Sequence, residues 1–113
     1  MKTYLSAKIH QAYVTEAALE YIGSITIDKA LMERVGFEPF EKVMVVSNTS
    51  GARLETYIIE GEKDSGVICM NGAAAHLIKK GEQVIIMGFS LADTPSPPKQ
   101  ILVDKNNRFV RYL

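Results

Sequence analysis

The chain has 113 residues, 47% of them hydrophobic and 23% charged, which is enough for one globular domain with its own core. Its 13 basic and 13 acidic residues balance, so charge gives no reason to expect nucleic acid or an anionic membrane as a partner. The single cysteine, Cys69, excludes an intrachain disulfide, and no signal peptide or membrane-spanning apolar run is recognisable, so we expect a cytoplasmic protein.

The first expected element is a strand over residues 3–13, where polar and apolar residues alternate. Alternation brings Lys8 and His10 together on the polar face of this strand. Such a face is either an ordinary solvated surface or part of a polar site. The apolar face of the strand consists of Leu5, Ala7 and Ile9. After the strand, residues 14–18 are expected to form a short connection.

A Gly-Ser pair interrupts the next extended segment, residues 19–27. Gly23 can adopt strained backbone angles, and the Ser24 hydroxyl is within reach of the carbonyl before it. Attack on that carbonyl would replace the amide by an ester, and β-elimination would leave dehydroalanine at position 24. Hydrolysis of dehydroalanine gives a pyruvoyl group. Gly-Ser pairs are also common in turns, so the pair alone does not establish this chemistry.

Asp28 is the expected N-cap of a helix over residues 29–35, which Gly36 ends. A hairpin follows, with strands over residues 42–47 and 53–60 joined by a polar turn. The helical spacing predicts that the helix buries Leu31, Met32 and Val35.

The second strand of this hairpin carries three side chains of chemical interest. Regular alternation places Arg53 and Tyr57 on one face and Thr56 on the other. Ordinary structural explanations exist for two of them. Arg53 would form a surface ion pair with Glu55 or Glu60, and Tyr57 would be a barrel tyrosine with a packed ring.

A short strand over residues 67–70 precedes the segment Asn-Gly-Ala-Ala-Ala-His at 71–76. Small residues there allow backbone amides to approach an anion, and Asn71 is an expected cap for a helix over residues 74–80; the alternative is a simple capped turn between strands. Many short strands and few short helices indicate a mainly β, barrel-like domain, although a sandwich has a similar pattern. Further strands are expected over residues 83–89, 100–104 and 108–113, with a loop over 91–99.

The chain resembles the precursors of the pyruvoyl-dependent aspartate 1-decarboxylase family over nearly its whole length. This resemblance implies a double-psi β-barrel, a homotetramer with active sites at subunit boundaries, and self-cleavage into residues 1–23 and 24–113. Ser24 would become the pyruvoyl cofactor, with no pyridoxal phosphate and no metal. The matching segments, in order, are residues 8–10, 21–28, 48–53, 56–57 and 71–76.

The family's activity implies that L-aspartate forms a Schiff base with the pyruvoyl group and is decarboxylated to β-alanine, which feeds pantothenate and coenzyme A synthesis. Tyr57 matches the family's proton donor. Thr56 matches a residue used in processing and substrate contact, and its hydroxyl would polarise the Gly23 carbonyl. Arg53 and Lys8 are expected at the side-chain carboxylate of aspartate. Further substrate contacts are expected from Asn71, Gly72, Ala73 and Ala74.

Thr56 and Tyr57 are adjacent, so we expect their side chains to serve sites formed with different neighbouring subunits. His10 is expected near the cleavage site. His10, His76 and Cys69 lack the number and spacing of a zinc site, and Cys69 is expected to be a buried apolar residue.

Two alternative hypotheses compete with an active decarboxylase. One is a non-catalytic small barrel that acts as a binding or assembly module, in which Gly23 and Ser24 belong to an ordinary loop. The other is an inactive zymogen that is never processed. The sequence does not decide whether cleavage is spontaneous or requires a maturation helper protein.

Overall fold

A computed structural model describes all 113 residues as nine strands and two short helices. This is the mainly β barrel with a few short helices that the sequence predicted. The strands are β1 (Lys2–Tyr13), β2 (Glu16–Ala18), β3 (Ser24–Asp28), β4 (Lys42–Ser47), β5 (Arg53–Gly61), β6 (Ile68–Asn71), β7 (Gln83–Ala92), β8 (Lys99–Val103) and β9 (Phe109–Tyr112). The helices are α1 (Lys29–Val35) and α2 (Ala74–Leu77).

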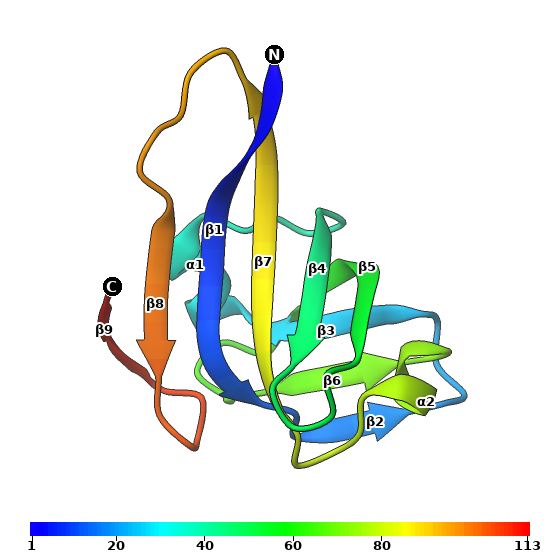
Figure 1. Ribbon diagram of the computed structural model, residues 1–113. Helices are drawn as coiled ribbons and strands as arrows, with labels where there is room; N and C mark the ends of the chain where they lie inside the picture. The colour runs from blue at the N-terminus through cyan, green and yellow to red at the C-terminus, as the bar shows by residue number, and fades with distance from the viewer.

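The strands hydrogen-bond in the order β2-β6-β3-β5-β4-β7-β1-β8-β9. Strands β1, β4 and β7 run side by side, and β2, β3 and β6 cross below them (Figure 1). Both β1 and β3 lie between one parallel and one antiparallel neighbour, so segments distant in sequence are interleaved. A single cluster of 20 buried apolar residues lies between the strands, so one core supports the whole fold.

Helix α1 has the boundaries and caps that the sequence predicted. The Asp28 side chain accepts a hydrogen bond of 2.8 Å from the Ala30 N–H, and Gly36 ends the helix with a φ of 80°. The three predicted apolar side chains are buried, and the helix packs against β1, β3, β5 and β8. Neither helix of the protein is long and apolar enough to cross a membrane.

Strand β1 contains a bulge that the alternating pattern did not predict. Gln11 has a φ of 59°, and the pairing of β1 with β7 shifts register between Ile9 and Ala12. Because of this extra residue, the buried positions change from Ala7 and Ile9 to Ala12 and Val14. The bulge therefore keeps the chain in contact with the core on both sides of Gln11.

The prediction for residues 14–27 was wrong in two respects. Residues 16–18 form β2, which pairs in parallel with β6, and residues 19–23 form an exposed loop rather than a strand. The cause is the topology, since β2 and β3 lie on opposite sides of β6. The connecting loop must therefore pass over the end of β6, and it brings Gly23 to that end.

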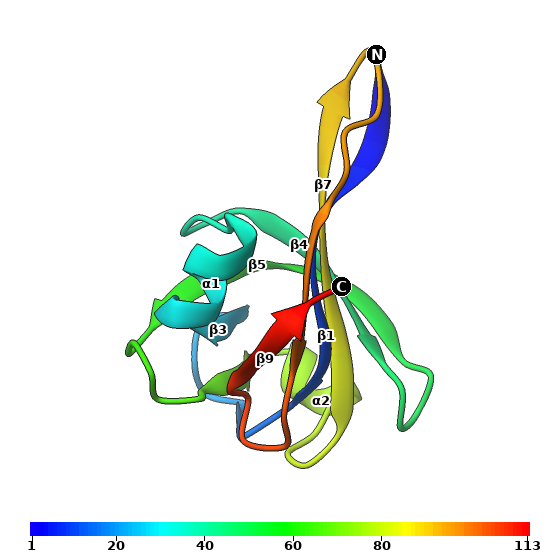
Figure 2. The same cartoon turned by 90° about the vertical axis from the view of Figure 1, so that its left-hand side faces the viewer.

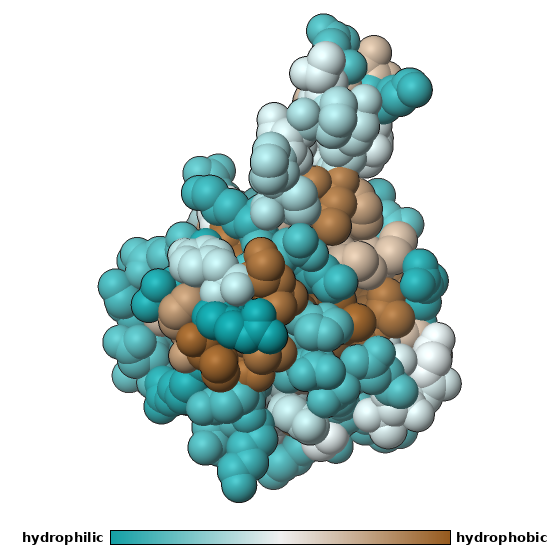
Figure 3. Space-filling model, turned by 60° about the vertical axis from the view of Figure 1, so that its left-hand side comes forward, coloured by the Kyte–Doolittle hydropathy of each residue, from teal (hydrophilic) through white to brown (hydrophobic).

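The other end of the molecule carries a projecting arm. Strand β7 is longer than predicted because its last residues pair with the start of β1, from Leu5↔Phe89 to Lys2↔Ala92. Figure 2 shows this pair extending away from the barrel. The predicted C-terminal hairpin is present as β8 and β9. Figure 3 shows apolar side chains gathered on the face that carries this hairpin, where Val110 and Leu113 are exposed.

Candidate active site

A hollow of about 370 Å³ lies where the loop after β2 meets β5 and the end of β6. It brings together seven of the ten site residues that the sequence predicted, all except Lys8, Arg53 and Gly72. The lining residues are Gly23, Ser24, Leu54, Glu55, Thr56, Tyr57, Asn71, Ala73, Ala74 and Leu77.

The hollow exists because β3 covers only part of the β5 edge. Pairing between β3 and β5 starts at Ile25↔Ile58, so the residues of β5 before Ile58 have no partner on that side. Thr56 and Tyr57 both line the hollow within one chain, which contradicts the expectation that they serve different sites. An open strand edge can be reached from both faces of the strand, so adjacent residues contribute to one hollow.

Ser24 is fully buried and its hydroxyl makes two hydrogen bonds. It donates to the Ile22 carbonyl oxygen over 2.8 Å and accepts from the side-chain amide of Asn71 over 2.9 Å. The φ of Gly23 lies outside the left-handed region, so the backbone strain expected at this glycine is not present there. The Ser24 hydroxyl is therefore held by two hydrogen-bond partners rather than by a strained peptide.

Asn71 does not cap a helix as the sequence predicted. Helix α2 begins after Ala73 without a side-chain cap and ends at Leu77, because Ile78 is extended and fully buried. Asn71 is instead the last residue of β6 and lies directly opposite Ser24 in the antiparallel pairing with β3. Its Nδ2 group therefore donates both to Ser24 Oγ and, over 3.0 Å, to Thr26 Oγ1.

Gly72 allows the β6 end to approach the Gly-Ser peptide closely. It has a φ of 65°, and a Cβ atom at this position would lie 2.7 Å from the Gly23 Cα atom. Its N–H donates to the Ala18 carbonyl oxygen over 2.8 Å. Only glycine fits both the backbone conformation and the space. The neighbouring Ala73 and Ala74 continue the wall of the hollow.

Glu55 is a lining residue that sequence reasoning treated only as a surface partner for Arg53. Its carboxylate pairs with Lys42 Nζ at 2.7 Å, and both side chains are more than half exposed. The ion pairs suggested for Arg53 are absent, because Glu60 pairs with Lys29 at 3.9 Å. The alternation of β5 places Glu55 on the same face as Arg53, and this pattern could have indicated Glu55 as a site residue.

Arg53 and Lys8 lie away from the hollow in this chain. The Arg53 guanidinium is exposed, and its Nη1 atom lies 3.5 Å from the Met44 sulfur on the neighbouring strand. Lys8 lies on β1, and β4 and β7 separate that strand from β5. Three strand spacings of about 4.8 Å each place the two strands about 14 Å apart along the sheet.

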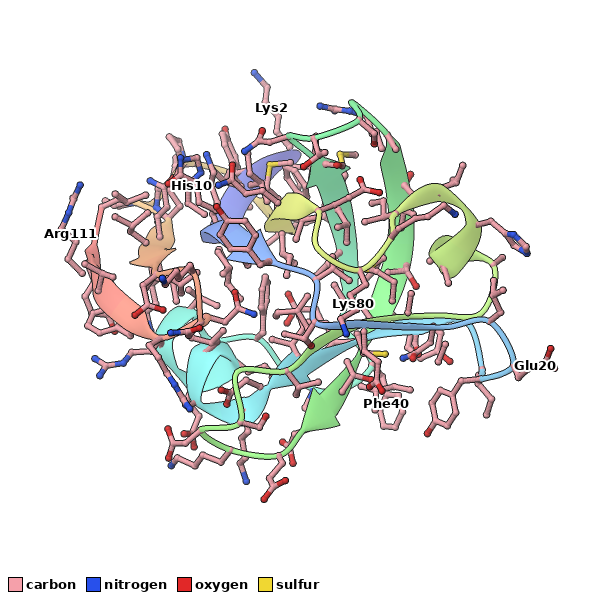
Figure 4. All side chains as sticks on the ribbon, turned by 90° about the horizontal axis from the view of Figure 1, so that it is seen from below. Lys2, His10, Glu20, Phe40, Lys80 and Arg111 are labelled. Carbon is pink, nitrogen blue, oxygen red and sulfur yellow. The ribbon has the colours of Figure 1, made fainter.

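His10 is also remote from the cleavage site within one chain. Figure 4 shows His10 on β1 and Glu20, in the loop before Ser24, on opposite sides of the molecule. The His10 Nδ1 atom is buried without a hydrogen-bond partner. Burial, and then the neighbouring Lys8 charge, lower the pKa of His10. The shared polar face predicted for these two residues is therefore present.

The surroundings of Ser24 fit a reactive group made from the serine itself. The Ser24 side chain is excluded from water, has an N–H donor at its oxygen, and lies beside a hollow with apolar walls from Leu54 and Leu77. No group of three or more His, Cys, Asp or Glu side chains is arranged to hold a metal ion.

Comparisons with known proteins agree with the resemblance. The sequence model of a family described as aspartate decarboxylase matches residues 1–110. A curated aspartate 1-decarboxylase of Geobacillus sp. (strain WCH70) is 50% identical over 116 aligned residues, covering 99% of this chain and 91% of the relative. The Neisseria meningitidis FAM18 protein of that name is 50% identical, covering 95% and 87%. The Bacillus subtilis 168 protein is 51% identical, covering 93% and 87%.

Proposed function

The chain belongs to the aspartate decarboxylase family, and on that premise we propose that it cleaves itself between Gly23 and Ser24 to become active. The reaction of the family is decarboxylation of L-aspartate to β-alanine and carbon dioxide, which supplies pantothenate and coenzyme A synthesis. Membership over the whole chain decides against a non-catalytic barrel. The observation that carries the self-cleavage proposal is the buried Ser24 hydroxyl, which accepts an Asn71 N–H beside the hollow.

In the proposed cleavage, Ser24 Oγ attacks the Gly23 carbonyl carbon and its proton passes to the amide nitrogen as the C–N bond breaks. The product is an ester with a free Ser24 amine. Loss of the Ser24 Cα proton then breaks the Cβ–Oγ bond and releases the Gly23 carboxylate. Water then hydrolyses the resulting dehydroalanine. Its nitrogen leaves as ammonia, and its carbon skeleton remains as a pyruvoyl group. Thr56 lines the same hollow, and we assign its hydroxyl to the Gly23 carbonyl oxygen.

The pyruvoyl group supplies an electron sink for the electrons that decarboxylation releases. The remaining work falls to side chains around the hollow. Tyr57 lies at its wall, and its phenol group carries an O–H that can be donated. We therefore assign Tyr57 as the donor of the proton that replaces the lost carboxylate. Backbone groups of Gly72, Ala73 and Ala74 would orient the substrate without bulky side chains.

A second copy of the chain would complete the site. The hollow of one chain is lined by one acidic side chain, Glu55, and by no Lys, Arg or His side chain. The substrate aspartate has two carboxylates, which need cationic partners. The cationic residues expected to bind them, Lys8 and Arg53, lie elsewhere on the surface. Exposed apolar side chains at the hollow (Leu77) and in the loop before Gly23 (Tyr21 and Ile22) provide a contact surface. We therefore propose a homotetramer in which a neighbouring subunit contributes the cations, with L-aspartate as substrate.

Denaturing mass spectrometry of the purified protein tests this function. We expect fragments 1–23 and 24–113, with pyruvoyl at the start of the larger one, and carbon dioxide release from L-aspartate. Ser24→Ala should leave the chain intact and abolish release, since alanine has no hydroxyl. An active protein with an intact chain, or turnover by Ser24→Ala, would contradict the proposal. An intact, inactive wild-type chain would identify a zymogen, and cleavage on addition of a cell extract would indicate a helper protein.

A further inference from the structure

Cys69 lies where its thiol can orient the Asn71 amide against Ser24. We propose that Cys69 is a positioning residue for self-cleavage, because its thiol donates a hydrogen bond to Asn71 Oδ1 and so directs Asn71 Nδ2 toward Ser24 Oγ. This inference rests on the proposed function, since it concerns the bond that Ser24 breaks. It assigns a role to a residue that the sequence predicted to be only a buried apolar side chain.

Four side chains on one face of the β3–β6 pair make the arrangement. Ser24 lies opposite Asn71, and Thr26 lies opposite Cys69. The two pairs are two residues apart along each strand, so all four side chains are neighbours on one face. The Cys69 sulfur lies 3.1 Å from Asn71 Oδ1, and Asn71 Nδ2 lies 2.9 Å from Ser24 Oγ. Ser24 then donates to the Ile22 carbonyl oxygen. A continuous hydrogen-bonded chain therefore runs from the thiol to the reactive hydroxyl.

The thiol is the partner that distinguishes the two ends of the Asn71 amide. The ends have nearly the same shape, but Oδ1 only accepts and Nδ2 only donates. Hydroxyl groups such as those of Ser24 and Thr26 can do either, so they accommodate both orientations. Burial, then the nearby Glu16 charge and a hydrogen bond with the Glu16 side chain, raise the pKa of the Cys69 thiol, which favours its protonated form. A protonated thiol donates to Oδ1 but is a poor acceptor for Nδ2.

The orientation matters because Ser24 Oγ gives up its proton during attack and takes on negative charge when it becomes part of the released Gly23 carboxylate. An N–H from Asn71 stabilises this charge, whereas the opposite amide end would face it with a carbonyl oxygen. The same oxygen leaves with the Gly23 carboxylate when the Cβ–Oγ bond breaks. All three side chains are nearly inaccessible, at 6% exposure for Cys69, 2% for Asn71 and 0% for Ser24.

Cleavage kinetics of Cys69→Ala and Cys69→Ser test the proposal. Both variants shorten the side chain, but only serine keeps a donor for Oδ1. Following fragments 1–23 and 24–113 by denaturing mass spectrometry, we expect Cys69→Ala to cleave about three- to tenfold more slowly than wild type. Cys69→Ser should cleave within about twofold of wild type. Thermal unfolding of both variants verifies that they fold. Wild-type cleavage by Cys69→Ala, or equal slowing in both variants, overturns the inference while leaving the proposed function intact.

Infrared spectroscopy tests the hydrogen bond independently of any cleavage. The chain has one cysteine, so its S–H stretching band belongs to Cys69 alone. In Ser24→Ala, which keeps the chain intact, we expect this band at a lower frequency than that of a free thiol. The additional change Asn71→Ala should remove the shift. An unshifted band, or a shift that survives Asn71→Ala, overturns the inference whether or not the wild-type chain cleaves.

Discussion

At the residue scale, the Ser24 hydroxyl does not donate to the peptide carbonyl that it is proposed to attack. The Ser24 hydroxyl donates to the carbonyl of Ile22, not to that of Gly23, and the Asn71 amide holds its oxygen. For attack on Gly23, the hydroxyl must leave the Ile22 carbonyl while its oxygen stays near Asn71. We therefore expect the residues that determine the position of the Gly23 peptide to control the rate of the proposed cleavage.

Gly72 is one of these residues, and Gly72→Ala should slow cleavage strongly. A Cβ atom there would lie 2.7 Å from Gly23 Cα and 2.8 Å from Gly23 N, so the peptide that Ser24 attacks must move. A displacement of about 1 Å can cost about 100-fold in rate. The left-handed backbone alone would cost about 1–2 kcal/mol of stability. Cleavage kinetics and denaturant unfolding measure the two effects separately.

Gly51→Ala is the matched control for this prediction. Gly51 has a similar φ of 79°, but nothing lies within 4 Å of an added Cβ atom. It should therefore lose a comparable amount of stability and cleave at the wild-type rate. Equal cleavage rates in the two variants would show that the close contact between Gly72 and Gly23 has no part in processing.

At the element scale, Asp28 links β3 and α1 to the turn before β6. Its buried carboxylate accepts hydrogen bonds from the N–H groups of Ala30, Asp64 and Gly66 at 2.8, 2.9 and 2.8 Å. One side chain therefore caps a helix and fixes a turn at the end of the strand that begins with Ser24. Losing it leaves several donors unpaired, some of them buried.

Asp28→Ala should accordingly destabilise the protein by about 3 kcal/mol, the sum of a lost cap and poorly satisfied buried donors. Urea unfolding measures this loss. Asp104→Ala is the comparison, because that carboxylate also accepts from two backbone N–H groups, of Asn106 and Arg108, but is exposed. Water can replace it there, so the loss should be clearly smaller. Similar losses would mean that the burial of Asp28 contributes little.

Elements with clear local sequence signals, such as α1, were predicted, whereas features that depend on distant pairing alone, such as β2, were not. Helix α1 was predictable because Asp28 and Gly36 mark its ends and its apolar spacing is regular. β2 was missed because its three residues are extended only through their pairing with β6. The role of Asn71 was missed for the same reason. Only the register of β3 against β6 places its amide opposite Ser24.

At the scale of the whole molecule, the hollow of one chain contains Ser24 but not Lys8 and Arg53, the cations expected to bind the substrate. The family resemblance identified both sets of residues from sequence motifs. Their separation could not be predicted from those motifs, because it depends on the strand order that places β4 and β7 between β5 and β1. A neighbouring chain is the direct way to bring Lys8 to the hollow.

Subunit mixing tests this arrangement. Ser24→Ala lacks the reactive serine and Lys8→Ala lacks the cation, so we expect each variant alone to have little activity. If a neighbouring subunit supplies Lys8, randomly mixed tetramers have both residues intact at about one quarter of their sites. Coexpression should then restore carbon dioxide release to about that fraction of wild type. Ser24→Ala coexpressed with Tyr57→Phe should restore none, because both residues line the hollow of one chain. If the first pair also restores none, Lys8 acts within its own subunit or not at all.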